Sequence, residues 1–323
     1  MRGGERAAIE KLERTLSRGA PGRRRVKIGI GDDAAVLRQS SGLIVFSVDA
    51  CVEGVHFDRS WLTLADVGWR SFQAAASDLA AMGAAPVAAL SSLVLPPATS
   101  LEELTAIGRG QAAASRDTDC PIVGGNLARG GELSVTTSVL GEVSRPLTRS
   151  GALPGEELWL VGQIGLAAAG IEVLRRGGLA GRAGSTADLR ACVSAWRRPR
   201  AQIALGRKLV GRASATIDVS DGLAGDAAHL ARSSGVRVVI QGRLLRAALP
   251  RALLRACGRL GVDPLELALR GGEDYALLAS GPGRRRPPFA RRVGRVESGS
   301  GATYEREPGQ QLELGPGFDH FLD

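Results

Sequence analysis

The sequence predicts an α+β protein with two domains. The chain has 323 residues, which is enough for two domains of ordinary size. Long strand-like segments are mixed with helical ones, and the alternating pattern of residues 133–143 indicates an antiparallel partner, which together favour α+β over a doubly wound sheet. A segment rich in proline and glycine near residues 145–155 separates two groups of elements. We therefore expect an N-terminal domain over residues 1–146 and a C-terminal domain over residues 147–323.

The N-terminal domain is expected to combine helices with several strands. Ser100 and Glu103 have the spacing of a capping box, which predicts the start of a helix. The spacing of apolar residues predicts helices over residues 5–18, 65–83 and 101–115. Short apolar segments predict strands over residues 43–50, 87–96, 121–126 and 133–143. We expect strand 43–50 to be buried, because it is continuously apolar, and strand 133–143 to be half-exposed.

The C-terminal domain is expected to repeat strand–turn–helix units. The segment IDVSDGLAGDAAHLA begins a turn and a helix after a strand, and Gly235 is placed to end that helix. Residues 215–235 are predicted to form a strand, a turn and a helix, and residues 271–281 a glycine turn followed by a strand. Strands are also predicted over residues 157–162 and 236–242, and a helix over 165–178. Two loops are expected over residues 177–189 and 282–292 because both are rich in glycine, proline or charge.

Composition excludes several functional classes. The net charge is +9, but the arginines that cause it are dispersed along the chain, so we expect no nucleic-acid partner. No stretch of about 18 apolar residues predicts a membrane span, and the charged N-terminus does not resemble a signal peptide. The four cysteines form no C-x-x-C pair and are expected to be buried free thiols. We therefore expect a cytoplasmic protein without a membrane association.

Acidic residues recur where apolar segments end. Each could be a turn residue or a helix cap when taken alone, but together they could share cations. The set is Asp32, Asp33, Asp49, Asp78, Asp218, Asp221, Glu273 and Asp274. Oxygen ligands without histidine or cysteine favour Mg²⁺ over zinc, and Mg²⁺ usually binds together with phosphates. In the segment DVSD, Asp218 and Ser220 are expected to project from the same face of a strand, so both could reach one ligand.

The sequence lacks the common phosphate-binding signatures. Neither a P-loop, nor a Rossmann glycine motif, nor the protein-kinase motifs are present. Only three histidines occur, and they do not support a Ser–His–Asp triad. His56 lies in a glycine-containing loop after a strand, where it could either contact a ligand or serve the structure of the loop. A phosphate-binding function would therefore need another architecture.

Eight segments in order resemble the thiamine-monophosphate kinase family. They are GIGDDAAVL, SVDACVEGVHF, SDLAAMGAAP, VGGN-x-x-RG, RSGALPGEELWLVG, IDVSDGLAGDAAHLA, GGEDYALL and GPGFDHF. SDLAAMGA alone is similar to the wider superfamily of aminoimidazole ribonucleotide synthetase and selenophosphate synthetase. The motifs VEGVHF, SGA-x-PG, GGEDY and the closing FDHF point to the kinase branch specifically. The whole match spans about residues 25–321.

The resemblance implies a fold, a reaction and a site. The fold would be like aminoimidazole ribonucleotide synthetase, with N-terminal domains that pair into a barrel-like sheet in a homodimer. The reaction would transfer a phosphoryl group directly and in line from ATP to thiamine monophosphate, with several Mg²⁺ ions and no phosphoenzyme, giving thiamine diphosphate and ADP. Asp33, Asp78 and Asp218 would be central to catalysis.

The resemblance also implies individual contacts. The metal ligands would be Asp33, Ser47, Val48, Asp49, Asp78, Asn126, Asp218 and Asp221. Gly125, Asn126, Arg149 and Ser220 would contact ATP, whereas His56, Glu273 and Phe318 would contact thiamine monophosphate. Asp32, beside Asp33, would assist it or hold the loop.

Three positions depart from the family pattern. Asn126 stands where the family usually has a metal-binding aspartate, so the site has one charge fewer. Val48 stands where a threonine is common, which leaves only a backbone carbonyl as a ligand, and Ala276 replaces a glutamate. Two alternatives therefore stay open: a related enzyme that uses ATP on another small substrate, and a nucleotide-binding paralogue without turnover.

Overall fold

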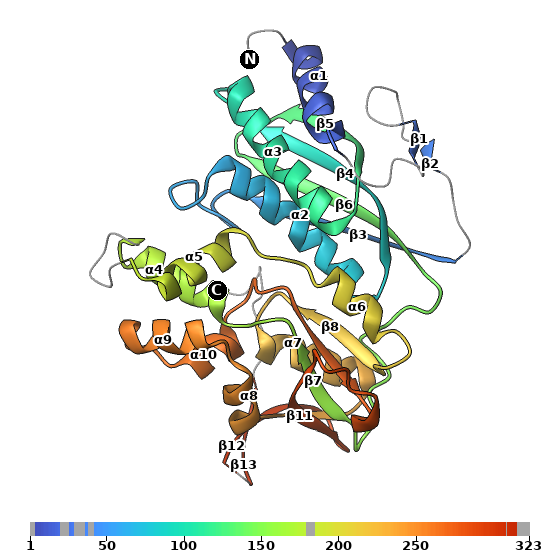
Figure 1. The fold of residues 1–323 in the computed structure, drawn as a ribbon, viewed down its shortest axis with the longest axis vertical. Helices are drawn as coiled ribbons and strands as arrows, with labels where there is room; N and C mark the ends of the chain where they lie inside the picture. Colours follow the sequence, from blue (N-terminus) through green and yellow to red (C-terminus); the bar gives the residue numbers. More distant parts are fainter. Residues whose placement is uncertain are drawn as a thin grey trace. The chain divides into compact units, whose positions relative to one another are not determined.

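The chain divides into two compact units. The structure, a computed structural model, describes residues 4–19, 26–28, 36–37, 42–178, 185–307 and 309–314. Unit 1 consists of Met1–Leu79 with Ala84–Ser144, and unit 2 of Ala80–Gly83 with Arg145–Asp323. Both units combine helices with β-sheets (Figure 1). No helix in these described ranges has both the length and the apolar character needed to cross a membrane.

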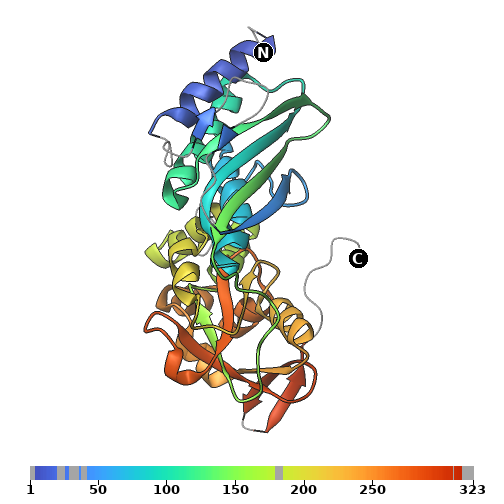
Figure 2. The same ribbon diagram turned by 90° about the vertical axis from the view of Figure 1, so that its right-hand side faces the viewer.

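Unit 1 is built on a four-stranded sheet. Its strand order is β3-β6-β4-β5, in which β6 runs antiparallel to both neighbours and β4 and β5 are parallel. The helices are α1 (Gly4–Ser17), α2 (Leu64–Ala81) and α3 (Leu101–Thr118), and the strands are β1 (Val26–Ile28), β2 (Val36–Leu37), β3 (Leu43–Val52), β4 (Ala85–Leu95), β5 (Ile122–Arg129) and β6 (Ser134–Val143). Helix α1 packs on α3, and Figure 2 shows both at one side of the sheet.

Helices α2 and α3 cross in direct contact because each contributes a glycine. A Cβ on Gly68 of α2 would lie 2.1 Å from the carbonyl oxygen of Ile107. A Cβ on Gly110 of α3 would lie 1.9 Å from the carbonyl oxygen of Ala65. Such distances are far below van der Waals contact, so this crossing requires glycine at both positions.

The two faces of the unit 1 sheet differ in their surroundings. Helix α2 covers the inner face, where Leu79 packs against the position of Gly141 on β6. The outer face of β3 is apolar and exposed, with Phe46 67% and Val48 58% accessible. The prediction that residues 43–50 form a buried strand is therefore wrong in its burial, although the strand itself is present. A continuous apolar run cannot show which of its two faces is covered.

Unit 2 contains a seven-stranded sheet. Its order is β13-β12-β9-β11-β7-β10-β8, and β12 and β9 are its one parallel pair among the described strands. The strands are β7 (Glu157–Val161), β8 (Ala215–Val219), β9 (Arg237–Gln241), β10 (Ala276–Gly281), β11 (Arg291–Glu297), β12 (Gly301–Glu307) and β13 (Gln310–Glu313). The helices are α4 (Leu166–Arg175), α5 (Ala187–Arg197), α6 (Ile203–Leu209), α7 (Leu223–Ser234), α8 (Gly242–Ala248), α9 (Arg251–Leu260) and α10 (Pro264–Arg270), with the 3-10 turn η2 (Gly283–Arg285).

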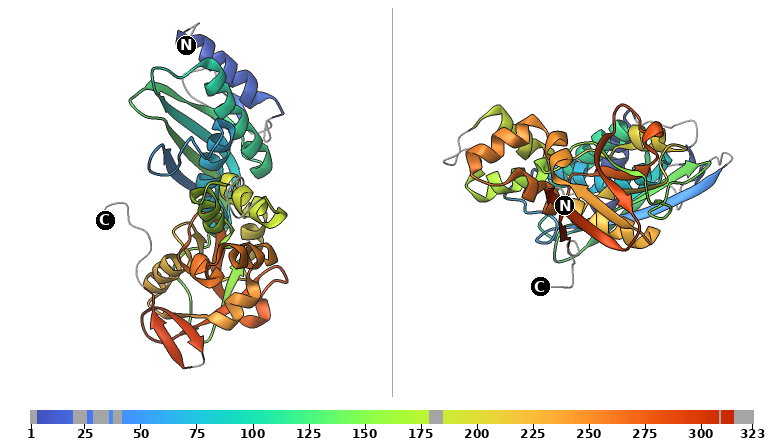
Figure 3. Two further views of the ribbon diagram at one scale, coloured as in Figure 1. Left: turned by 90° about the vertical axis from the view of Figure 1, so that its left-hand side faces the viewer. Right: turned by 90° about the horizontal axis from the view of Figure 1, so that it is seen from below.

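Most unit 2 helices form one group. Helices α4, α5, α9 and α10 pack on one another, and the right panel of Figure 3 shows them gathered at one side of the unit. Strands β7 and β10 are neighbours in the sheet and are buried along nearly their whole length. Strand β10 is hydrogen-bonded between β7 and β8, so the end of β8 and the start of β10 lie at the same end of the sheet.

The predicted elements agree with the structure except in extent. The capping box of Ser100 and Glu103 is confirmed at the start of α3. Strand β5 continues to Arg129, beyond the predicted strand 121–126, and β11 begins at Arg291 inside the loop predicted over 282–292. Residues 179–184 of the loop predicted over 177–189 lie outside the described residues, and α5 begins at Ala187. All four cysteines are free and buried, as predicted.

The glycine contact between α2 and α3 gives a test of stability. Replacing Gly110→Ala should destabilise the protein by about 1–3 kcal/mol, because the new methyl group must displace the backbone of α2. The matched control is Gly258→Ala in α9, where a Cβ would meet nothing within 4 Å and helix propensity favours alanine. Thermal unfolding of both variants checks this. Equal midpoints would contradict the close crossing.

Candidate active site

Three predicted metal ligands of unit 1 lie on the inner side of its sheet. Ser47 and Asp49 are two residues apart on β3, so their side chains project from the same face. Asp78 comes from α2, the helix that covers this face, and its Oδ2 accepts a hydrogen bond from Ser47 Oγ. The sequence thus brings a hydroxyl and a carboxylate from two distant segments into contact.

Two other predicted ligands lie on the outer face of the same sheet. Val48 is opposite Ser138 of β6, and Asn126 is opposite Ser92 of β4. Both are exposed. By strand alternation they face away from Ser47 and Asp49, so the structure separates the predicted unit 1 ligands into an inner and an outer group.

Gly125 has a structural reason to be glycine. It faces the inner side beside Ser91 of β4, and a Cβ at this position would lie 1.9 Å from the Ser91 carbonyl oxygen. The two parallel strands could not pair at this spacing with any side chain at residue 125. Its backbone is consequently the only part that could contact a nucleotide.

His56 lies in the turn that follows β3. Its backbone N–H donates to the carbonyl oxygen of Val52, and its Nδ1 accepts the Val52 N–H at 3.2 Å. A neutral imidazole that accepts at Nδ1 carries its proton at Nε2. The ring is half-buried, so this arrangement orients a ring that a ligand could still reach.

Three loops of unit 2 meet at one end of its sheet. They follow β7, follow β8 and precede β10. Asp218 is buried in β8, whereas Ser220 is half-buried and Asp221 is exposed in the turn after it. The prediction that strand alternation puts Asp218 and Ser220 on one face is wrong, because β8 ends at Val219. The turn, and not the strand, positions Ser220.

A buried carboxylate holds this turn. Asp226, in the first turn of α7, is 3% exposed, and its Oδ2 accepts the backbone N–H groups of Ser220 at 3.1 Å and Asp221 at 3.3 Å. Burial first, and then the charges of Asp218 and Asp221, raise the pKa of Asp226 to about 8, although the two N–H groups lower it. The carboxyl groups therefore repel one another, which a bound divalent cation would relieve.

The loop before β10 has an unusual backbone. Glu273 and Tyr275 have φ angles of 65° and 50°, a region that residues with a side chain rarely adopt. The Glu273 N–H donates to the Ser220 carbonyl oxygen at 2.7 Å, and the Tyr275 N–H to that of Val219 at 2.9 Å. These bonds connect the Glu273 loop to the Ser220 turn and maintain the strained conformation.

Asp274 joins the same loop to α4. Its Oδ2 accepts the Gly165 N–H at 2.6 Å and its Oδ1 the Ala167 N–H at 3.1 Å, so it caps the start of that helix. Part of the residue reaches solvent, but its carboxyl group is enclosed by protein. Burial raises the pKa of Asp274 to about 7, and the charge of Glu273 acts in the same direction against the two N–H groups.

Arg149 lies within electrostatic range of the same region. Ser234 of α7 donates to the Arg149 carbonyl oxygen at 3.0 Å. The pKa of His229, also on α7, is lowered by burial first and then by Arg232 and Arg149, whereas Asp221 raises it. Arg149 and Asp221, which both belong to the predicted site, therefore act on the same side chain of α7, that of His229.

Sequence reasoning missed two residues of this region. Asp226 follows the Ser-Asp-Gly turn at the start of a helix, and an acid at that place could have been recognised as a loop ligand. Trp196, whose indole N–H donates to Glu273 Oε2 at 2.6 Å, lies 77 residues away in sequence. No local pattern gives that contact.

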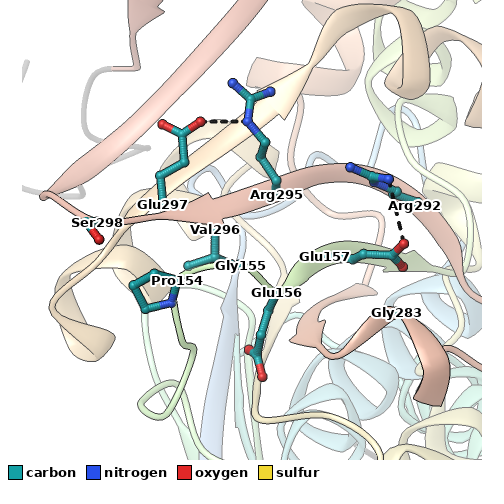
Figure 4. A pocket seen from close by; sticks show the side chains of 10 residues that line it. All are labelled: Pro154, Gly155, Glu156, Glu157, Gly283, Arg292, Arg295, Val296, Glu297 and Ser298. Carbon is teal, nitrogen blue, oxygen red and sulfur yellow. Dashed lines mark hydrogen bonds and ion pairs between the residues drawn. The ribbon is translucent and has the colours of Figure 1, made fainter.

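The described residues also form a pocket at the opposite end of the unit 2 sheet. It has a volume of about 590 Å³ and is lined by Glu156, Glu157, Arg292, Arg295 and Glu297 among others (Figure 4). Arg295 pairs with Glu297 at 2.6 Å, and Arg292 approaches Glu157 at 3.7 Å. Because strand β7 begins here and ends at the three loops, none of the predicted site residues lines this pocket.

Some predicted site residues cannot be placed. Asp32, Asp33 and Phe318 lie outside the described residues. Within the described ranges, no three His, Cys, Asp or Glu side chains are arranged to hold a metal ion. The oxygen donors of the Ser47–Asp78 pair and of the Asp218–Asp221 segment nevertheless fit Mg²⁺, which commonly binds one or two carboxylates together with phosphates and water.

Comparison with known proteins gives a consistent result. The family model described as AIR synthase related protein, N-terminal domain, matches residues 31–143. The chain is 35% identical to the thiamine-monophosphate kinase of Aquifex aeolicus (strain VF5) over 294 residues, which cover 90% of this chain and 92% of that protein. It is 36% identical to the thiamine-monophosphate kinase of Mycobacterium tuberculosis over 298 residues, which cover 92% of this chain and 86% of that protein.

The fold is similar to that of a solved relative. The structure of AaThiL complexed with AMPPCP and TMP has a TM-score of 0.81 and 33% identity, covering 98% of this chain and 97% of that one. The prediction of a two-domain α+β fold like aminoimidazole ribonucleotide synthetase is confirmed. The assignment of individual residues to metal, nucleotide or acceptor stays a prediction.

The enclosed Asp274 carboxyl predicts how stability changes with pH. The pKa of Asp274 is about 7 in the folded protein and about 4 in the unfolded chain. The protonated carboxyl therefore contributes its full share to the free energy of unfolding below pH 4, and this contribution is lost as the pH rises to 7. Between pH 5 and pH 8 the thermal midpoint should therefore fall by about 3 °C more in the wild type than in Asp274→Asn. Calorimetry across this range checks it, and parallel pH curves for the two proteins would contradict it.

Proposed function

The chain belongs to the thiamine-monophosphate kinase family, and we infer that it phosphorylates thiamine monophosphate with ATP, giving thiamine diphosphate and ADP. The observation that carries this conclusion is the match to kinases of this one name over about nine-tenths of the chain. The similarity in fold to a relative bound to AMPPCP and TMP agrees with it. The enzyme is thus an ATP-dependent phosphotransferase whose acceptor is itself a phosphate.

We propose that the transfer is direct and in line. A reaction of this kind needs the two phosphates to be positioned and their charge to be neutralised, with little covalent chemistry by the protein. Fixed backbone loops and carboxylates are the main features that the described residues offer at the predicted positions. Magnesium ions, when bound, would supply the charge neutralisation.

We propose the following roles for the predicted residues. Asp78 with Ser47 and Asp49, and Asp218 with Asp221, would hold Mg²⁺, since each group presents oxygen donors close together or on one face. Asp33 would join them, while the backbone carbonyl of Val48 and the side chain of Asn126, which projects from the outer face, would be weaker oxygen donors. Arg149, Ser220 and the backbone of Gly125 would bind ATP. His56, Glu273 and Phe318 would bind thiamine monophosphate.

We also propose that a second copy of the chain covers the outer face of β3. Ile44, Phe46 and Val48 are all more than half exposed on this face, and Leu90 of β4 adds to it. A contiguous apolar strip of this kind on a sheet indicates an interface. A homodimer in which the unit 1 sheets of two copies pair would bury this strip. Such a pairing is the barrel-like sheet that the family resemblance implies.

The first experiment is a direct assay of the purified protein. With ATP, Mg²⁺ and thiamine monophosphate, the wild type should form thiamine diphosphate, measured by chromatography. Asp78→Asn should lower kcat by at least about 100-fold, because an amide cannot replace the charge of a metal-binding carboxylate, while its oxygen still accepts from Ser47. The matched control is Asp119→Asn, at an exposed left-handed position that asparagine tolerates, which should leave kcat unchanged.

The outcomes separate the alternatives. Normal turnover by Asp78→Asn would refute the metal assignment. ATP binding by the wild type without formation of thiamine diphosphate would refute the kinase activity. Such a result would favour a related enzyme for another small substrate or a paralogue without turnover. The first variant to make would then be Asn126→Asp, which restores the aspartate that is usual in the family.

The proposed dimer is tested at Phe46, the most exposed side chain of the apolar strip. Phe46→Asp should convert a dimer to a monomer, because a charge would be buried in the apolar strip. Light scattering after size-exclusion chromatography measures the mass. The control Leu153→Asp changes a leucine of unit 2 with 60% exposure and should leave the mass unchanged. A monomeric wild type, or a dimeric Phe46→Asp variant, would refute this interface.

A further inference from the structure

The position of the Glu273 carboxylate is controlled from outside its own loop. The backbone of this loop is fixed by bonds to Ser220, Val219 and the start of α4. These bonds orient the Cα–Cβ bond of Glu273 but leave three side-chain torsions between the backbone and the carboxylate. A second constraint is therefore required before the carboxylate can present one fixed geometry to a ligand.

Trp196 supplies that constraint. Its indole Nε1–H donates to Glu273 Oε2 at 2.6 Å, a short distance for a bond to a carboxylate. The indole is 3% exposed and is held in α5, whose cap Thr186 accepts the Leu189 N–H. An indole N–H can only donate, so this bond directs Oε2 of Glu273 towards Trp196 and favours one orientation of the carboxylate.

The Glu273 loop is also connected to the Ser220 turn. The Glu273 N–H bonds the Ser220 carbonyl oxygen, and a Cβ on Gly272 would lie 2.3 Å from the same oxygen. The two segments are thus in backbone contact without room for a side chain between them. The geometry of Glu273 is consequently set relative to Ser220, which we have assigned to ATP.

We propose that Trp196 is a positioning residue for the phosphoryl acceptor, acting through Glu273. The inference rests on the proposed function, in which Glu273 contacts thiamine monophosphate. This molecule has an aminopyrimidine, a thiazolium cation and a phosphate. A carboxylate attracts the first two and repels the third, so Glu273 binds the amino or cationic part of the acceptor. Trp196 fixes the carboxylate oxygen that makes this contact.

The test removes the indole N–H and keeps an aromatic ring. Trp196→Phe should raise KM for thiamine monophosphate, and its Kd measured by calorimetry without ATP, by about 10-fold. KM for ATP should change by less than about 2-fold, because the Ser220 turn keeps its own bonds. A double-mutant cycle with Glu273→Gln should be strongly non-additive, because the proposed role of Trp196 acts through that carboxylate.

The chain provides a matched control. Trp159 is also buried, and its Nε1–H also donates to a glutamate, Glu157, at 2.9 Å, but at the opposite end of the sheet. Trp159→Phe should lower stability without changing KM or Kd for thiamine monophosphate. If Trp196→Phe changes only stability, as Trp159→Phe does, or if the cycle is additive, the positioning role is refuted.

The same measurements separate this inference from the proposed function. A wild type that forms thiamine diphosphate, with an unchanged KM in Trp196→Phe, refutes the role of Trp196 alone. A wild type that binds thiamine monophosphate without turnover refutes the kinase activity, and a weaker Kd in Trp196→Phe still supports the positioning role. A wild type that neither binds nor phosphorylates thiamine monophosphate refutes both.

Discussion

The enclosed carboxyl group of Asp274 is the constraint on which the candidate site of unit 2 depends. It connects a strained loop to the first turn of a helix 109 residues earlier in the sequence, through two backbone N–H groups. Together with the bonds from the Glu273 and Tyr275 N–H groups, these bonds maintain the left-handed φ angles of residues 273 and 275. Asp226 does the same for the turn after β8. Both carboxyl groups resist ionisation, so stability is lost to maintain loops that present Glu273, Ser220 and Asp221.

In unit 1 the corresponding constraint is a sheet with two different faces. The inner face is closed by α2, which approaches α3 closely enough to require glycine at the crossing. This packing places Asp78 beside Ser47. The outer face of β3 has no such cover in the described chain and remains apolar. Alternate residues of one strand therefore present oxygen donors on one side and an exposed apolar surface on the other.

Local signals in the sequence predicted the elements well. The Ser100–Glu103 capping box, Gly235 at the end of α7 and the alternation of residues 134–143 each depend on a few neighbouring residues, so they could be recognised without the fold. The exposure of Phe46 could not, because an apolar run does not show what covers it. The contacts of Glu273 with Trp196 and of Asp274 with Gly165 join distant segments, and their partners carry no pattern of their own. The motifs thus supplied the candidate site residues, whereas the fold explains how those within the described ranges are held.

The departures at Val48 and Asn126 fall on one face, and this location gives them a physical meaning. Both side chains project from the outer side of the sheet, whereas Ser47, Asp49 and the contact with Asp78 are on the inner side. If a second copy covers the outer face, an aspartate at residue 126 would need a cation to offset its desolvation, whereas an asparagine would need only hydrogen bonds. The replacement of threonine by Val48 removes a hydroxyl from the same side. The two changes therefore lie on one surface, and they leave the inner oxygen donors of unit 1 intact.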